Sequence, residues 1–342
     1  MTNRLNDRNY LRNRHRLSHQ QIDTWLGEKR EKEFLHEKLN QLKAVKNFLW
    51  VSSLLNKNNI THTCFKGPLL SYRIYNDPTV RISHDIDLLI DKEMIVPVMD
   101  ILISNGFQIT ENMFWPQKKA QQELFIKAIH HLSFYNSDLQ TCVEVHWVLI
   151  PTLPVRKKKM QKLIAENQTT IEFSGQTFTV LSPEFEFLYL LVHGARHGWN
   201  RLKWLVDIND YPKEKLDINK LQSLINQFKA WRIIGQVNIL LDYFFKQQLS
   251  IKKSIYLPSY FIRYPLTFIK NDNAQIQFTT KGIIKYNWYL LFIFVSICYK
   301  YNFIIENIFV RLADIKRIDS SYKIVYYIYR PYSFIKRRFL HV

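Results

Sequence analysis

The pattern of apolar positions predicts helices in the first part of the chain. Between residues 20 and 55, apolar residues recur every three or four positions among Glu and Lys, which is typical of one or two amphipathic helices. Residues 60–65 then form a short β-rich run. Helical spacing resumes over residues 69–75, directly after a Lys-Gly-Pro turn at residues 66–68.

A buried strand is predicted next. Residues 86–90 are apolar and β-branched enough for a strand. Only the carboxylates of Asp85, just before the run, and Asp87, within it, interrupt the apolar pattern. Residues 92–105 predict a helix that ends at Gly106, where a left-handed C-terminal cap is expected.

Two hairpins are predicted further along the chain. Strand-like runs at residues 131–135 and 141–148 flank an Asn-Ser-Asp turn, and runs at residues 171–173 and 178–181 flank Gly175. The alternation of strands and helices up to this point is that of an α+β fold.

The remainder of the chain is predicted to be mainly helical. Residues 151–162, with two prolines, are interpreted as a connection, and helical spacing runs from Ser182 to about residue 245. Four parts follow from these patterns: a solvated basic tail (1–18), a core with N-terminal helices (19–150), a helical region with a small hairpin (151–250), and a basic aromatic C-terminal helical region (251–342).

Composition narrows the possible classes. With 342 residues, 47% of them hydrophobic and 15% aromatic, the chain is long and apolar enough for real cores, which excludes disorder of the whole chain. The formal net charge of +19 favours anionic partners such as nucleotides, nucleic acid or lipid head groups. None of the eight glycines lies in a GxGxxG or GxxxxGKS/T motif, so neither a dinucleotide-binding fold nor a P-loop NTPase is supported.

The cysteines and the N-terminus favour a cytoplasmic protein. The three cysteines form no CxxC pair, and the N-terminus lacks the apolar segment of a secretory signal. The longest uncharged stretch, residues 286–299, is shorter than the roughly 20 residues of a membrane span. We therefore expect a cytoplasmic location, with peripheral contact to the inner face of the membrane as an additional option.

Asp85 and Asp87 are the main chemical signal. Residues two apart on a strand share one face, about 6.6 Å apart, and two carboxylates there repel each other unless a cation joins them. Oxygen ligands suit Mg²⁺ or Mn²⁺ better than zinc. The alternative is a surface strand end with solvated acids.

Glu144 is a third acid in the same situation. It shares a strand face with His146, whereas Val143, Val145 and Trp147 share the other face. If this strand lies beside the first, three carboxylates converge and can hold two ions about 4 Å apart, as in in-line phosphoryl transfer.

Basic residues supply candidates for phosphate binding. Lys66 and Gly67 end a strand at a predicted helix start, where backbone N–H groups and an ammonium can bind phosphate, although an ordinary turn fits the spacing equally well. Arg81 is expected either to neutralise a phosphate or to pair with Asp85 or Asp87.

His193 and His197 lie four apart on a predicted helix. With His146 they would be zinc ligands, but the glutamate of HExxH is absent. The favoured interpretation is that these histidines, with Trp204 and Asp207, pack the helical region or contact a bound nucleotide.

Taken together, several motifs resemble the uncharacterised nucleotidyltransferase family of the DNA polymerase β-like superfamily. The resemblance covers roughly residues 40 to 245. The motifs are Phe65-Lys66-Gly67, Tyr75, Arg81, Asp85 to Ile90, Asn105-Gly106-Phe107, Glu144 to Trp147, His193 to His197 and Arg201 to Ile208, which includes Lys203 and Asp207, with a weaker similarity at Tyr329-Arg330-Pro331.

The resemblance implies a short mixed sheet flanked by helices, followed by a helical region that closes over the nucleotide. It also implies that Asp85, Asp87 and Glu144 bind the metal ions and that Gly67 marks the phosphate-side helix start. The family's usual Gly-Ser or Gly-Gly is Gly67-Pro68 here, so a hydroxyl contact to the triphosphate is missing, and Lys66 is expected to compensate.

Two basic segments allow a second kind of partner. The run at residues 156–159 is interpreted as a solvated loop, with a nucleic-acid contact as the sharper alternative. Residues 301–342 interleave eight Lys or Arg with tyrosines and phenylalanines. Such a segment is typical either of an amphipathic helix on anionic lipid or of a helix docked on the core by its tyrosines.

The leading hypothesis is therefore a nucleotidyltransferase dependent on Mg²⁺ or Mn²⁺. It would move a nucleoside monophosphate from an NTP such as ATP to an acceptor hydroxyl and release pyrophosphate, and the acceptor would be a sugar, an RNA (as in a toxin or defence protein that modifies tRNA) or a protein. The alternative is a basic protein with a vestigial active site that binds nucleic acid or an anionic membrane surface.

Overall fold

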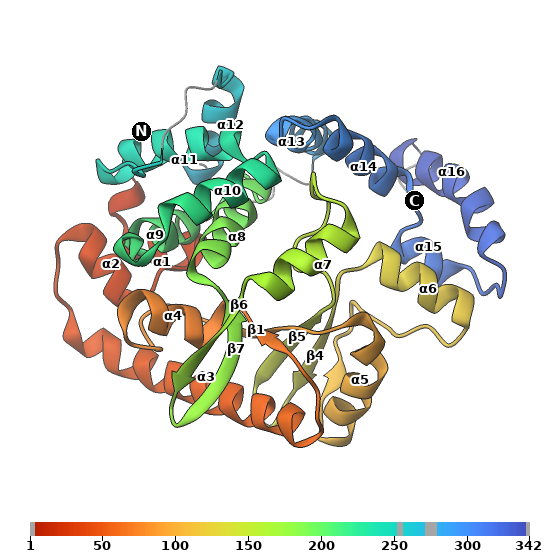
Figure 1. The fold of residues 1–342 in the computed structure, drawn as a ribbon, viewed down its shortest axis with the longest axis horizontal. Helices are drawn as coiled ribbons and strands as arrows, with labels where there is room; N and C mark the ends of the chain where they lie inside the picture. The colour runs from red at the N-terminus through yellow and green to blue at the C-terminus, as the bar shows by residue number, and fades with distance from the viewer. Residues whose placement is uncertain (1–3, 252–255, 271–278, 340–342) are drawn as a thin grey trace. The chain divides into compact units, whose positions relative to one another are not determined.

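The structure is a computed structural model, which describes residues 4–251, 256–270 and 279–339 (Figure 1). The strands of its sheet are β1 (Thr63–Cys64), β2 (Asp85–Leu89), β3 (Gln108–Ile109), β4 (His131–Asn136), β5 (Thr141–His146), β6 (Gln168–Phe173) and β7 (Gln176–Leu181). They form one seven-stranded sheet in the order β3-β4-β5-β2-β1-β7-β6. β2 runs parallel to β5 and β1 parallel to β7, whereas both predicted hairpins are antiparallel. The predicted α+β fold with a mixed sheet is confirmed.

The chain forms two compact units. The first comprises residues 1–53, 63–84 and 153–300, and the second comprises residues 54–62, 85–152 and 301–342.

The first unit is mainly helical. Its elements, besides three strands, are η1 (Arg4–Asn6), α1 (Arg8–His15), α2 (His19–Leu26), most of α3 (Glu31–Lys57), α4 (Gly67–Tyr75), α7 (Lys157–Glu166), α8 (Pro183–Arg196), α9 (Leu202–Asp210), η3 (Lys213–Lys215), α10 (Ile218–Phe228), α11 (Trp231–Phe245), α12 (Ser259–Lys270), α13 (Thr280–Ile293) and the start of α14 (Ile297–Ile308). The helical pattern predicted from Ser182 to about residue 245 is confirmed as α8 to α11.

The segment predicted as a solvated tail is instead helical and packed. Asp7 caps α1 by accepting hydrogen bonds from the backbone N–H groups of Asn9 and Tyr10, and Leu11 is fully buried. Arg8 also forms an ion pair with Asp23 of α2 at 2.5 Å. These contacts are made with residues other than the arginines spaced four apart at positions 4, 8, 12 and 16, and that arginine pattern by itself suggests a solvated segment.

The segment predicted as a connection also differs, because α7 begins within it at Lys157. Met160 and Leu163 are buried and anchor this helix, whereas residues 156–159 are exposed. Their exposure agrees with the solvated interpretation of the basic run. The β-rich run at residues 60–65 is likewise shorter than predicted, because only Thr63 and Cys64 form the strand.

Gly194 allows close packing inside the helical region. A Cβ at this position would lie 2.2 Å from Cζ3 of Trp199, whose side chain is fully buried. The Trp199 indole donates a hydrogen bond to Oε1 of Gln236 of α11 at 2.8 Å. The glycine therefore places a large aromatic ring directly against α8.

The second unit holds four strands of the sheet together with η2 (Lys92–Met94), α5 (Ile95–Ser104), α6 (Lys119–Ala128), α15 (Leu312–Arg317) and α16 (Lys323–Phe339). In β5, Val143 and Val145 are buried on one face, which leaves Glu144 and His146 on the other. α5 is followed by Gly106 with φ of +83°, so the predicted left-handed glycine at its C-terminal end is confirmed.

α16 is docked on the second unit by one face. α15 and α16 both contact α6 (Figure 1). Tyr326, Arg330 and Ser333 are buried, and Arg330 Nε lies 3.8 Å from the buried Asp314 Oδ2. The opposite face is exposed and apolar, since Ile324 and Ile328 are 61% and 71% exposed.

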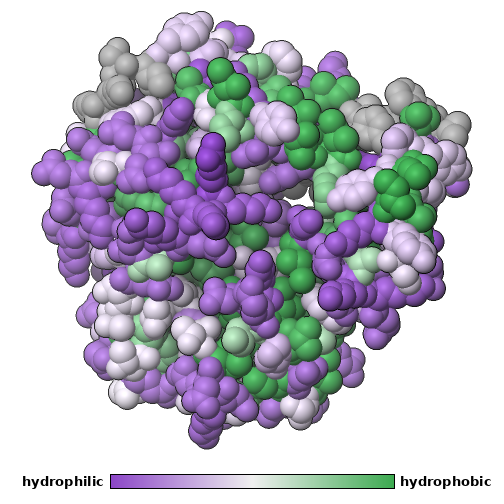
Figure 2. Space-filling view, turned by 45° about the vertical axis from the view of Figure 1, so that its right-hand side comes forward, coloured by the Kyte–Doolittle hydropathy of each residue, from purple (hydrophilic) through white to green (hydrophobic). Residues whose placement is uncertain are grey.

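Apolar side chains reach the surface elsewhere as well. Figure 2 shows them between polar side chains on one face of the molecule. Among the described helices, none is both long enough and apolar enough to cross a membrane.

Candidate metal and nucleotide site

The parallel pairing of β2 and β5 brings the predicted acids together. Asp87 lies directly opposite Glu144, and Asp85 lies opposite Cys142. Residues two apart on a strand share a face, so all three carboxylates belong to the same face of the sheet. Asp87 is 5% exposed, while Asp85 and Glu144 are half-buried.

His146 connects two of these acids. Its Nε2 lies 3.0 Å from Asp87 Oδ1 and 3.2 Å from Glu144 Oε2. His131 of β4 is the register partner of His146, and the two rings stack at 4.9 Å. Two imidazoles and two carboxylates therefore occupy one small region of the second unit.

The electrostatics confirm how closely the acids are grouped. Burial, followed by the negative charges of Glu144, Asp85 and Asp87, raises the pKa of the Cys142 thiol to about 11. Burial also acts to raise the pKa of Glu144, but the interaction with His146 and the nearby His131 outweigh it, so the pKa of Glu144 is lowered. Glu144 is therefore ionised at neutral pH, as a metal ligand must be.

The donor set fits a divalent cation. Asp87 Oδ1 and Glu144 Oε2 both lie within 3.2 Å of His146 Nε2, so the two carboxylates approach each other on either side of this imidazole nitrogen. Two carboxylates this close, one of them nearly buried, gain from a cation that neutralises them.

Lys66 and Gly67 lie in the first unit at the start of α4. Lys66 adopts φ of +67° and Gly67 φ of +60°, and residue 66 provides no side-chain hydrogen bond that caps the helix. Positive φ at a non-glycine residue is strained backbone, which concentrates at ligand-binding sites. The start of α4 therefore combines two successive residues with positive φ, which is the geometry of a tight strand-to-helix turn.

The predicted histidines lie near this turn. Lys66 Nζ lies 5.6 Å from the ring centre of Tyr189, and that ring stacks on His193 at 5.6 Å. His193 in turn contacts His197 at 4.6 Å between ring centres, and His197 contacts Trp204 at 5.0 Å.

These histidines are neutral at physiological pH. Desolvation, followed by the charge of Lys66, lowers the pKa of His193 well below its ordinary value and that of His197 to about 4. Among the described residues, the group with the spacing of a metal site consists of His131, Glu144 and His146. Neither His193 nor His197 belongs to it, so the structure supports their packing role and not the zinc alternative.

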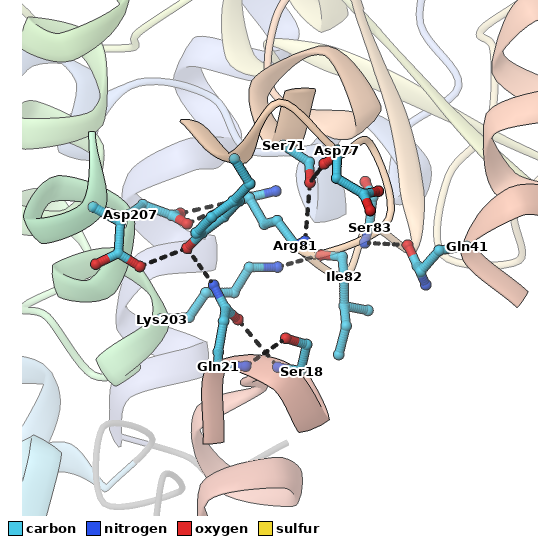
Figure 3. A network of polar contacts seen from close by, with 12 residues as sticks. Ser18, Gln21, Gln41, Ser71, Asp77, Arg81, Ile82, Ser83, Lys203 and Asp207 are labelled. Carbon is cyan, nitrogen blue, oxygen red and sulfur yellow. Dashed lines mark hydrogen bonds and ion pairs between the residues drawn. The ribbon is translucent and has the colours of Figure 1, made fainter. Parts of the chain in front are cut away.

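Buried polar contacts hold residues 81–83: Arg81 pairs with Asp207, Lys203 binds the Ile82 carbonyl, and Gln41 accepts from the Ser83 backbone N–H (Figure 3). Arg81 Nε lies 2.9 Å and 3.1 Å from the two carboxylate oxygens of Asp207, and Lys203 Nζ donates to the backbone carbonyl of Ile82. The predicted partners Asp85 and Asp87 are thus replaced by Asp207. Residues 81–83 lie just ahead of β2 in the sequence. Lys203 and Asp207 of α9 therefore fix the chain before the acidic strand begins.

His131 is the residue that the sequence alone did not single out, because it lies at the start of the strand predicted over residues 131–135. The register of the β4–β5 hairpin would have indicated that His131 lies beside His146. Pairing Asn136 with Thr141 requires His131 to lie opposite His146 in the antiparallel register.

A family model described as uncharacterised nucleotidyltransferase matches residues 13–246. The chain belongs to this family, as its motifs predicted.

Comparison with solved structures gives a distant similarity. An antigenic nucleotidyltransferase-like protein from Paracoccidioides brasiliensis is 14% identical, with a TM-score of 0.31, over 62% of this chain and 95% of that one. No curated protein matches the chain.

Proposed function

We propose that the chain is a metal-dependent nucleotidyltransferase that moves a nucleoside monophosphate from an NTP to an acceptor hydroxyl. The observation that carries this proposal is the register pair of Asp87 and Glu144, with Asp85 on the same face of β2. Family membership supports nucleotidyl transfer in general. The cytoplasm is the proposed location, and the acceptor is a sugar, an RNA or a protein.

Each residue has a defined part in the reaction. Asp85, Asp87 and Glu144 hold Mg²⁺ or Mn²⁺, which when bound neutralises phosphate charge and acidifies the attacking hydroxyl. Lys66 and the backbone at Gly67 are proposed to bind the triphosphate, whereas Arg81, paired with the buried Asp207, holds the chain ahead of β2.

The chemical step is an in-line displacement at the α-phosphorus. The acceptor oxygen forms the new P–O bond, the bond to the pyrophosphate oxygen breaks, and pyrophosphate leaves. One of the site carboxylates accepts the hydroxyl proton. Atoms and charges balance without a further reactant.

Carboxamide variants test the assignment. Asp85→Asn and Asp87→Asn keep the side-chain shape but lose the charge, so both should lose Mg²⁺-dependent NTP binding in thermal-shift titrations. Labelled products should also vanish when labelled NTP is incubated with cell extract and analysed by mass spectrometry. Asp100→Asn, an exposed site on α5, is the matched control. Unchanged NTP binding and transfer in both site variants would refute the proposal.

A second proposal concerns contact with an anionic membrane surface through α16. The exposed face of this helix carries Ile324, Ile328, Tyr332 and Ile335, spaced three or four apart, on a chain with net charge +19. An apolar stripe on a basic chain is typical of helices that lie in the lipid interface.

Vesicle flotation tests this surface. The protein should float with vesicles that contain phosphatidylglycerol and not with pure phosphatidylcholine, and Ile328→Glu should abolish flotation. Val325→Glu, at a less exposed position on the same helix, should reduce flotation less. Equal flotation of wild type and Ile328→Glu would refute the contact.

A further inference from the structure

We infer that His131, Glu144 and His146 hold a divalent first-row transition ion, for which Mn²⁺ is the paramagnetic probe, in a mixed imidazole and carboxylate site that disfavours Mg²⁺. This inference deepens the proposed function and rests on it for the ion's role in transfer. The binding itself can be measured independently.

The three residues converge on one point. One ligand atom from each lies within 4.8 Å of the other two, a spacing at which a single ion can contact all three. His131 belongs to β4 and the other two to β5, and the register pairs His131 with His146 and Ser133 with Glu144. Two hydrogen-bonded strands therefore fix the donors, as a preorganised metal site requires.

The surrounding charge favours a cation. Asp87 Oδ1 lies 3.0 Å from His146 Nε2, so Asp87 adds a further carboxylate to the cluster. A metal-binding histidine is usually supported by a carboxylate hydrogen-bonded to its other ring nitrogen, so Asp87 at Nε2 would support ligation through Nδ1 of His146. Asp87 thus serves either as an additional ligand or as the group that orients His146.

The ligand chemistry decides which ion binds. Mg²⁺ prefers oxygen ligands and retains its water, whereas imidazole nitrogen suits zinc, copper, iron and nickel ions; Mn²⁺ is the weakest binder of the first-row series and so the most stringent probe. Two imidazoles in the site therefore shift the preference away from Mg²⁺. Asp85 and Asp87, whose donors are all oxygen, remain suited to the hard ion that accompanies the nucleotide, and Glu144, which lies opposite Asp87, would be shared between the two ions.

Spectroscopy on the full-length, metal-stripped wild type tests nitrogen ligation directly. Mn²⁺ is added, and electron spin-echo modulation should show coupling to ¹⁴N from coordinated imidazole. Calorimetric titration should give an affinity for Mn²⁺ more than about tenfold above that for Mg²⁺. Absence of nitrogen coupling, or equal affinities for the two ions, would overturn the inference.

A variant identifies the ligand. His131→Gln should weaken Mn²⁺ binding by about tenfold or more and leave Mg²⁺ binding unchanged. His36→Gln, an exposed histidine on α3, is the matched control and should bind Mn²⁺ as wild type does. Wild-type Mn²⁺ affinity in a folded His131→Gln would contradict the assignment, and the wild-type spectrum decides the question if this variant does not fold.

The outcomes separate this inference from the proposed function. Nitrogen coupling without any NTP-dependent transfer would sustain the metal site and refute the nucleotidyltransferase. Transfer with Mg²⁺ but without nitrogen coupling would sustain the nucleotidyltransferase and refute the mixed imidazole and carboxylate site.

Discussion

Replacing Arg81 should destabilise the first unit strongly, because its partner is buried. The side chains of Arg81 and Asp207 are 7% and 1% exposed, and Arg81 Nε lies within 3.1 Å of both carboxylate oxygens. Arg81→Met removes the cation and leaves a carboxylate with almost no access to water. Breaking one side of a buried ion pair costs about 3–5 kcal/mol of unfolding free energy.

The double variant distinguishes loss of the pair from loss of packing. Asp207→Leu alone leaves a buried guanidinium and should cost a similar amount. Arg81→Met/Asp207→Leu removes both charges, so its cost should fall short of the sum of the single variants by about 3 kcal/mol.

Urea unfolding followed by circular dichroism measures these energies. Lys162→Met is the control, since its ion pair with Glu166 on α7 is exposed and should contribute less than about 0.5 kcal/mol. Additive effects, or single variants that each cost under about 1 kcal/mol, would show that the Arg81–Asp207 ion pair does not stabilise the first unit in this way.

Three further predictions follow from other buried groups. Gly194→Ala should cost about 1–3 kcal/mol, since the new Cβ would lie 2.2 Å from Trp199, and urea unfolding would show this against the small gain in helix propensity. Burial and then the charge of a neighbouring arginine lower the pKa of His15 from 6.5 to about 3, so the unfolded chain binds the proton more tightly. The stability contributed by neutral His15 is therefore complete above pH 6.5 and is lost as the pH falls toward 3. Between pH 7.5 and pH 5, wild type should lose about 2 kcal/mol more of its unfolding free energy than His15→Gln. Parallel losses in the two proteins would contradict this. With its pKa raised from 9.0 to about 11, Cys142 should react with iodoacetamide at pH 8 about a hundredfold more slowly than an ordinary thiol, and Asp85→Asn should accelerate the reaction.

The sequence determined much of the local structure. The apolar run after Asp85 predicted β2, the turn residues near 136–138 predicted the β4–β5 hairpin, and the helical spacing that begins at Ser182 predicted α8. The alternation in β5 placed Glu144 and His146 on one face. These features depend on neighbours in the chain, so a local pattern is enough to show them.

Partners distant in sequence were decided only by the tertiary structure. The sequence could not choose between phosphate and an acid for Arg81, because Asp207 lies 126 residues away. It also missed the packing of the N-terminal helices, since Asp23 and Leu202, which contact residues 8 and 15, are not part of the local arginine pattern.

The candidate site shows the same division. Asp87 and Glu144 were recognisable as acids within apolar strands, but their contact depends on which strands become neighbours and in which register. That choice is made by the burial of whole strand faces, since a shift of one residue would turn every side chain to the opposite face. The sequence therefore supplied the ligand types and their faces, whereas cooperative packing of distant segments brought them together.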